Sequence, residues 1–277
     1  PKLPPLVGRP DALETRSFVH ASPGALRLDS TDGLVRIATG EGASISGEAV
    51  IRAFRRGTTG QDELMQCVKD LVQVREESGV LVIQTERGPR PADFDLFVEY
   101  KITIPKGTNI EVTSNNGNVW VLPGCGAVRV VGRNSDIDIA GPLGSVHVES
   151  VNGRIQLAEA PAGGTLRTVN GDVYADVAGG TLDASTDNGV VHAKLLGPGV
   201  DEASLTSQNG GVNLSMDRGA SASITATALR GSVTSQFAVD TAGGASQPRY
   251  LKGTIGDGRA RINLDTLNGN IVIARIE

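Results

Sequence analysis

The chain has 277 residues and a net charge of −5, from 26 Lys and Arg against 31 Asp and Glu. Nucleic acid is therefore not expected as a partner, because no basic surplus exists to neutralise phosphates. Hydrophobic residues make up 39% and aromatics only 3%, with 36 glycines. This composition favours thin layers of small and β-branched side chains over a thick globular core.

Neither a cofactor nor a metal ion is expected. The histidines His20, His147 and His192 have no Cys, Asp or Glu at metal-ligand spacing, so they are interpreted as surface residues. Cys67 and Cys125 match no disulfide framework and are predicted to be buried free thiols. The sequence begins without Met and has no run of 18 apolar residues, which is compatible with a removed signal or anchor.

The N-terminal part combines strand signals with one helix signal. Residues 1–25 carry five prolines and are expected to form an irregular lead-in. Alternation predicts strands from residue 26 to 37 and over 44–56. Thr59 resembles an N-cap, and the apolar spacing after it predicts one short helix over 61–70.

A hairpin and a long strand are expected next. Residues 71–83 contain two short apolar runs joined by a Glu-Ser-Gly turn. A loop is predicted over 85–93, and a strand over 94–104 that Pro105 terminates. We interpret 26–107 as strands, a short helix and a hairpin that cap a larger repeat region.

One short phrase recurs through the repeat region, 108–277. It reads Ser-Asn-Asn-Gly-Asn-Val around Gly117 and Thr-Val-Asn-Gly-Asp-Val around Gly171. The glycine position recurs at 117, 135, 153, 171 and 189, always 18 residues apart, and then at 210 and 231. A fixed period of this length indicates a repeat architecture. A Gly-, Ala-, Ser- and Thr-rich loop insertion is expected near 237–249.

The columns of the repeat predict coiling. The position two after the glycine is always Val or Ile, and apolar columns four after and five before it share that face. We therefore predict an all-β fold, a single-stranded parallel β-helix or β-solenoid with coils of about 18 residues. An antiparallel meander with Asn-Gly hairpins is the alternative.

An asparagine precedes the glycine in nearly every repeat, and Arg230 alone breaks the column. In a solenoid these side chains form a stacked amide ladder, and Asn and Gly both accept the left-handed backbone of a tight corner. The predicted structural ladder consists of Asn116, Asn134, Asn152, Asn170, Asn188, Asn209 and Asn268.

The chain resembles the bacterial putative-adhesin family, a domain of unknown function built as a β-solenoid with Asn-Gly-x-Val phrases. The resemblance rests on the segment from Thr103 to Val112 and on the closing segment from Thr266 to Ile273, and it covers roughly 26–277. It implies a bacterial protein that is exported or anchored at the cell surface, hence an extracytoplasmic location. The family's adhesin label implies an interaction role.

An outward stripe is the candidate binding surface. It occupies the column three after the glycine, with Trp and Tyr expected two coils, or about 10 Å, apart. Exposed aromatics among polar groups suit an extended glycan, whereas cross-strand packing is the plainer interpretation. The stripe residues are Trp120, Asp138, Gln156, Tyr174, His192 and Asn213, followed by Thr234.

Our interpretation is a non-enzymatic extracytoplasmic scaffold whose partner is unknown, with a glycan or another cell-surface component as the candidates. A polysaccharide lyase or hydrolase is one alternative, although Asp138, Asp172, Asp176 and Asp183 have no basic partner in the same column. The pair Asp136 and Asp138 offers too few ligands for calcium. Self-assembly through an open final coil is another alternative, since exposed strand edges accept further strands.

Overall fold

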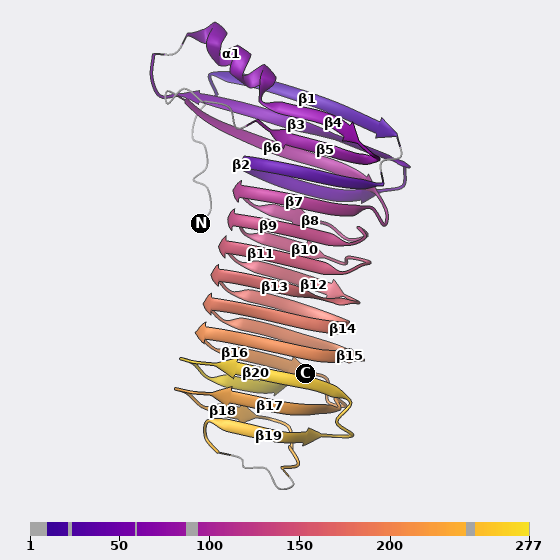
Figure 1. Cartoon of the computed structure of the whole chain (residues 1–277), viewed down its shortest axis with the longest axis vertical. Coiled ribbons are helices and arrows are strands. Elements are labelled where there is room, and N and C mark those ends of the chain that lie inside the picture. Colours follow the sequence, from indigo (N-terminus) through magenta and orange to yellow (C-terminus); the bar gives the residue numbers. More distant parts are fainter. Residues whose placement is uncertain (1–9, 22–23, 59, 87–93, 242–246, 277) are drawn as a thin grey trace.

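The computed structural model describes residues 10–21, 24–58, 60–86, 94–241 and 247–276, which form an elongated stack of β-coils (Figure 1). Neighbouring repeats pair in parallel at an offset of one coil: Ile137 lies beside Val119 on one side and Ile155 on the other. The predicted parallel β-solenoid is therefore confirmed, and the antiparallel meander is wrong for the repeats.

Each coil has two faces joined at corners. In spatial order, the first face contains β4 (Val72–Glu77), β5 (Val80–Thr85), β2 (Ala25–Gly40), β7 (Asn109–Asn116), β9 (Val128–Asn134), β11 (Val146–Asn152), β13 (Gly163–Asn170), β14 (Val173–Asn188), β15 (Val191–Asn209), β20 (Ala260–Thr266), β17 (Ala222–Ala228) and β19 (Tyr250–Ile255).

The second face carries the other half of every coil. In the same direction it contains β1 (Ala12–Ala21), β3 (Ser44–Arg55), β6 (Phe94–Pro105), β2, β8 (Val119–Val121), β10 (Ile137–Ala140), β12 (Ile155–Ala160), β14, β15, β16 (Val212–Met216), β21 (Ile271–Arg275) and β18 (Val233–Ser235). The long strands β2, β14 and β15 continue around a corner and so belong to both faces.

The core is a set of straight apolar columns between the two faces. The column two after the glycine is fully buried from Val119 through Val212 and again at Ile271, and Val112 to Leu264 form a second buried column. Alternate residues of a strand point to opposite faces, so the apolar set lines the interior while the intervening residues face outward. β-Branched side chains suit this half-buried, pleated surface.

Small residues let the corners stack closely. Gly153 has a φ of +143°, and a Cβ there would lie 2.1 Å from the carbonyl oxygen of Ser135 in the preceding coil. Buried hydroxyls pair with carbonyls at the same corner: Thr186 donates to the oxygen of Gly171 at 2.8 Å and Thr266 to that of Gly210 at 2.7 Å. These bonds satisfy polar groups that burial would otherwise leave at a cost.

Side-chain amides connect seven successive coils in one hydrogen-bonded row. Each Nδ2 donates to the Oδ1 of the preceding coil, so Asn152 donates to Asn134 and accepts from Asn170, both at 2.8 Å. The remaining bonds of the row are Asn116 to Asp32, Asn134 to Asn116, Asn188 to Asn170, Asn209 to Asn188 and Asn268 to Asn209. An acceptor-only carboxylate thus terminates the row at one end.

Antiparallel strands and a helix close the N-terminal end of the stack (Figure 1). Strand β3 pairs antiparallel with β6, and β1 then pairs antiparallel with β3. Helix α1 (Gln61–Asp70) lies over these strands and buries Leu64 and Val68. In β6, Tyr100 shares a 2.9 Å hydrogen bond with Thr85, and burial raises the pKa of Tyr100 to about 12.

Several expectations for this end are confirmed and two are corrected. The helix at 61–70, the hairpin β4–β5 and the strand from residue 94 are as predicted. Within the expected irregular lead-in, 12–21 is instead strand β1, which buries only Ala12 and Phe18 and so carries little apolar alternation. The helix N-cap is Gly60, without a side-chain cap, and Thr59 lies outside the described residues, as do 87–93 of the predicted loop.

The C-terminal end departs from sequence order. Strand β20 pairs with β15 on one side and β17 on the other, while β21 lies between β16 and β18. The final coil is therefore inserted between two earlier ones, and β19 covers the outer edge of β17 antiparallel. The expectation that the last coil of the sequence is the open end is wrong, because both edges of β20 and β21 are occupied. End-to-end assembly through the strands at this end stays a prediction.

The expected insertion near 237–249 is partly ordered structure. Phe237 is buried, and the guanidinium of Arg275 lies 5.2 Å from its ring centroid. The backbone of Asp240 forms an isolated antiparallel β-bridge with that of Thr254. The described residues 236–241 and 247–249 lie outside the named strands, as expected of a loop, although Phe237 is buried, and 242–246 lie outside the described part of the chain.

Replacing Asn152 with Ala should destabilise the protein by about 1–3 kcal/mol, because the substitution removes two ladder bonds and leaves partners in both neighbouring coils. Urea unfolding followed by circular dichroism measures the change. Asn115→Ala, an asparagine outside the row, is the matched control and should change stability by less than about 0.5 kcal/mol. Equal effects of the two substitutions would show that the row contributes nothing specific.

The inserted position of the final coil predicts which cysteine pairs cross-link. Ser204 and Asn263 are register partners in adjacent strands, so the double variant Ser204→Cys, Asn263→Cys should form a disulfide on mild oxidation. Ser204→Cys with Thr225→Cys should not, because β20 separates those strands by two strand spacings, about 9.6 Å. Peptide mass spectrometry distinguishes the products, and the opposite pattern would restore sequential stacking.

Candidate functional site

The outward column three after the repeat glycine forms a continuous stripe on the second face. Its members lie side by side in adjacent strands by register: Trp120 beside Asp138, then Gln156, Tyr174, His192 and Asn213. Beyond Asn213 the column continues through Val272 to Thr234. Because the strands are hydrogen-bonded along their length, each side chain of this stripe has a fixed neighbour.

Tyr174 and His192 form the centre of the stripe. Their rings are stacked with centroids 4.6 Å apart and planes within 1° of parallel. The Nδ1 of His192 in turn shares a 3.3 Å hydrogen bond with the amide of Asn213. The stack covers one face of each ring, so the half-buried pair offers ring edges, the tyrosine hydroxyl and Nε2 of the imidazole for contact with a ligand.

A shallow cavity of about 380 Å³ surrounds this pair. Stripe residues Gln156, Tyr174, His192 and Asn213 line it together with side chains from the two adjacent outward columns, namely Arg154, Asp176, Lys194 and Ser215. We call these eight residues the stripe groove. Charges within it are matched, because the ammonium of Lys194 lies 3.6 Å from a carboxylate oxygen of Asp176.

Half of the stripe groove was absent from the candidate residues chosen from sequence. Arg154 stands one residue after its repeat glycine, whereas Asp176, Lys194 and Ser215 stand five after theirs. All share the outward parity of the chosen column. The two-residue alternation of the strands therefore indicated that these four residues face outward. They were missed because only the column three after the glycine was considered.

Trp120 lies outside the groove. Its register partners place it three coils from Tyr174, about 14 Å away, which corrects the expected separation of two coils. Its indole Nε1 donates to Asp138 at 3.0 Å, and the guanidinium of Arg36 lies 5.6 Å from the ring centroid. The tryptophan is thus engaged by neighbouring side chains of the stripe.

The carboxylates considered for catalysis are engaged with basic groups or backbone. Arg154 donates to Asp138 at 3.1 Å, and Arg167 to Asp183 at 2.8 Å. Asp176 does have a basic partner in its own column, Lys194, so the expectation of none was wrong. Asp172 accepts the backbone N–H of Val190 at 2.8 Å. These contacts use the carboxylates as ion-pair partners and hydrogen-bond acceptors.

The other histidines and the cysteines of the described residues do not gather into a common site. Among the described residues, no three His, Cys, Asp or Glu side chains are grouped closely enough to hold a metal ion. Nε2 of His147 lies 2.7 Å from a carboxylate oxygen of Glu149, and Nδ1 of His20 lies 3.8 Å from one of Glu76. Both histidines are distant from His192 in the sequence.

Both cysteines are free. Cys125 is buried, which raises the pKa of its thiol, whereas Cys67 is only half-buried, contrary to expectation.

Comparisons with known proteins agree with this architecture. The family model Toastrack DUF4097 matches residues 26–274, and the chain belongs to that family. A solved structure of a putative adhesin from Bacteroides fragilis is similar, with a TM-score of 0.53, 14% identity and coverage of 96% of this chain and 97% of that one. At this identity the likeness concerns the fold.

Two further solved structures align over most of the chain with lower scores. A putative cell adhesion protein from Clostridium sporogenes has a TM-score of 0.27, 9% identity and coverage of 96% and 100%. A putative adhesin from Parabacteroides merdae has a TM-score of 0.31, 9% identity and coverage of 96% and 96%. No curated protein matches. Within the described residues, no helix is long and apolar enough to cross a membrane.

The ring stack should be measurable as a coupling energy. In a double-mutant cycle, Tyr174→Ala and His192→Ala should each destabilise the fold, with a coupling of about 0.5–1.5 kcal/mol. Tyr174→Ala combined with the distant Asn263→Ala provides the control and should be additive within about 0.5 kcal/mol. Denaturant unfolding gives the free energies, and additivity of the Tyr174 and His192 substitutions would contradict the stack.

Proposed function

We propose that the protein is a non-enzymatic, extracytoplasmic scaffold that acts as an adhesin-like interaction module. Its stack of hydrogen-bonded coils is closed at the N-terminal end by α1 and antiparallel strands, and β19 covers an edge at the other end. Such a rod presents long, rigid lateral faces to a partner. The adhesin name of the similarly folded protein from Bacteroides fragilis supports the same role.

The stripe groove is the contact surface in this proposal, and its ligand is a neutral glycan. The single observation that carries this assignment is the cavity of about 380 Å³ in which six polar and charged side chains surround the Tyr174–His192 pair. Since the pair stacks on itself, recognition uses hydrogen bonds to sugar hydroxyls and contact with ring edges.

The charge pattern selects among polysaccharides. Asp176 is paired with Lys194 inside the groove, and the guanidinium of Arg154 is paired with Asp138 at its margin. A polyanion therefore meets no unmatched basic cluster, and a polycation meets no unmatched acidic one. An uncharged chain retains these pairs and adds its own hydrogen bonds to them.

Binding to immobilised neutral glycans tests the proposal. We expect Tyr174→Ala and Asn213→Ala to weaken binding about tenfold or more, since each removes groups that face the groove. Trp120→Ala is the matched control on the same stripe, and it should bind within about twofold of the unaltered protein.

Three results would overturn this function. Absence of glycan binding across a broad neutral panel would remove the ligand class. Loss of binding with Trp120→Ala alone would move the site out of the groove. Release of shortened products during incubation with neutral polysaccharides or polyuronates would make the protein an enzyme.

A further inference from the structure

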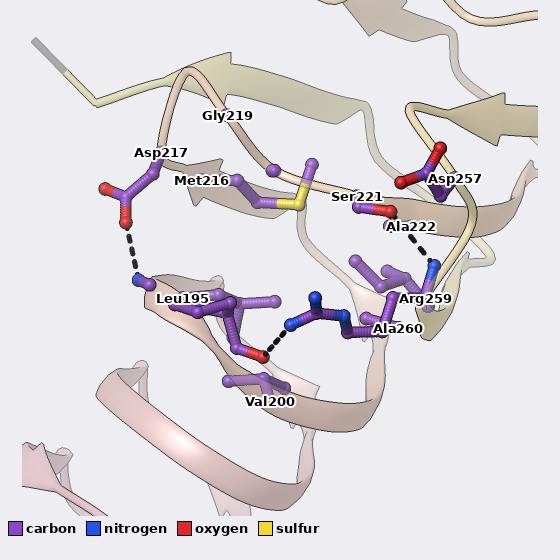
Figure 2. Close-up of a pocket in the computed structure, with 14 residues that line it drawn as sticks. Leu195, Val200, Met216, Asp217, Gly219, Ser221, Ala222, Asp257, Arg259 and Ala260 are labelled. Atoms are coloured by element: carbon purple, nitrogen blue, oxygen red, sulfur yellow. Dashed lines mark hydrogen bonds between the residues drawn. The ribbon is translucent and has the colours of Figure 1, made fainter.

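A second cavity opens at the corner where the final coil enters the stack (Figure 2). It encloses about 370 Å³, within the range of small-molecule sites. Three segments that are distant in sequence build it: 195–200 within β15, 216–222 between β16 and β17, and 257–262 leading into β20. We call it the corner pocket, and it shares no residue with the stripe groove.

The floor of the corner pocket is aliphatic. Leu195, Val200, Met216 and Ile262 belong to the solenoid core and are at most 4% exposed. These side chains come from β15, β16 and β20, which meet where the final coil is inserted. An apolar group that entered would remove its own surface from water against this aliphatic floor and gain the corresponding hydrophobic free energy.

A positioned guanidinium crosses the pocket above this floor. The backbone N–H of Arg259 donates to Oγ of Ser221 at 3.1 Å, and its guanidinium donates to the carbonyl of Pro198 at 3.3 Å. Figure 2 shows the side chain extended between these two anchors. The bond to Pro198 uses one of five N–H donors, so the fork keeps the geometry that suits a carboxylate.

Two carboxylates also line the pocket, Asp217 at the left and Asp257 at the right of the view in Figure 2. Asp217 accepts the backbone N–H of Gly197 through Oδ2, a bond that holds the pocket's two turns together. Asp257 is exposed on the turn before β20. The rim therefore combines one positive and two negative groups over an apolar floor.

We propose that the corner pocket binds an α-amino acid with an apolar side chain. The ligand carboxylate pairs with Arg259, its ammonium with Asp257, and its side chain lies on Leu195 and Met216. A simple carboxylic acid would meet the two aspartates without a compensating charge, and a simple amine would meet Arg259. A zwitterion matches both signs of the rim.

Isothermal titration of the whole protein with L-leucine tests this assignment. Isocaproate retains the carboxylate and the aliphatic body, isoamylamine retains the ammonium, and glycine retains both charges without the side chain. We expect leucine to bind and each of the three analogues to bind at least about tenfold more weakly, because each lacks one of three contacts. Equal affinity for isocaproate or isoamylamine would overturn the zwitterion, and no leucine binding at millimolar concentration would overturn the site.

Substitutions locate the site. Arg259→Gln and Asp257→Asn should each raise the Kd for leucine about tenfold or more, and both residues are exposed, so the fold should be retained by circular dichroism. Arg261→Gln, at an exposed arginine of β20 that does not line the pocket, is the control and should leave the Kd within about twofold. Equal loss with Arg261→Gln would assign the effect to general charge. Because glycan binding uses other residues, either proposal can fail while the other stands.

Discussion

In-register stacking of successive coils is the constraint on which the rest of this structure depends. A single coil has only a thin row of aliphatic residues and no core of its own, so it needs neighbours on both sides. The amide row from Asn116 to Asn268 and the corner hydroxyls fix which residue lies over which. If the pairing of one coil with the next shifted by one residue, the Val and Ile columns would turn outward. The fixed repeat period places equivalent residues in register and so disfavours this shift.

The same register determines the exposed surface. Each outward residue has fixed neighbours one coil above and below, so Tyr174 meets His192 and Asp176 meets Lys194 without any local loop to position them. A functional surface built this way is rigid, because a groove residue can shift only if its strand does. This favours ligands that lie along or across several coils over ligands that need an enclosing lid.

The coiling could be predicted from sequence because one period governs both the apolar columns and the asparagines. The placement of the final coil could not. Strands β17 and β20 carry similar apolar patterns, so nothing local indicates which of them pairs with β15. Strand β1 escaped notice because only Ala12 and Phe18 of it are buried. Half of the groove residues could be predicted from the sequence. The other half were missed because only one outward column was considered, whereas three adjacent columns contribute.

The inserted position of β20 and β21 affects how the molecule can be made. A solenoid whose spatial and chain orders agree can add coils progressively as the polypeptide emerges from a ribosome or a translocation channel. Here β17 and β18 have their parallel partners only in residues 260–275. β17 and β18 can therefore pair with the rod only after the last coil has been delivered and has taken its place between them and β15 and β16.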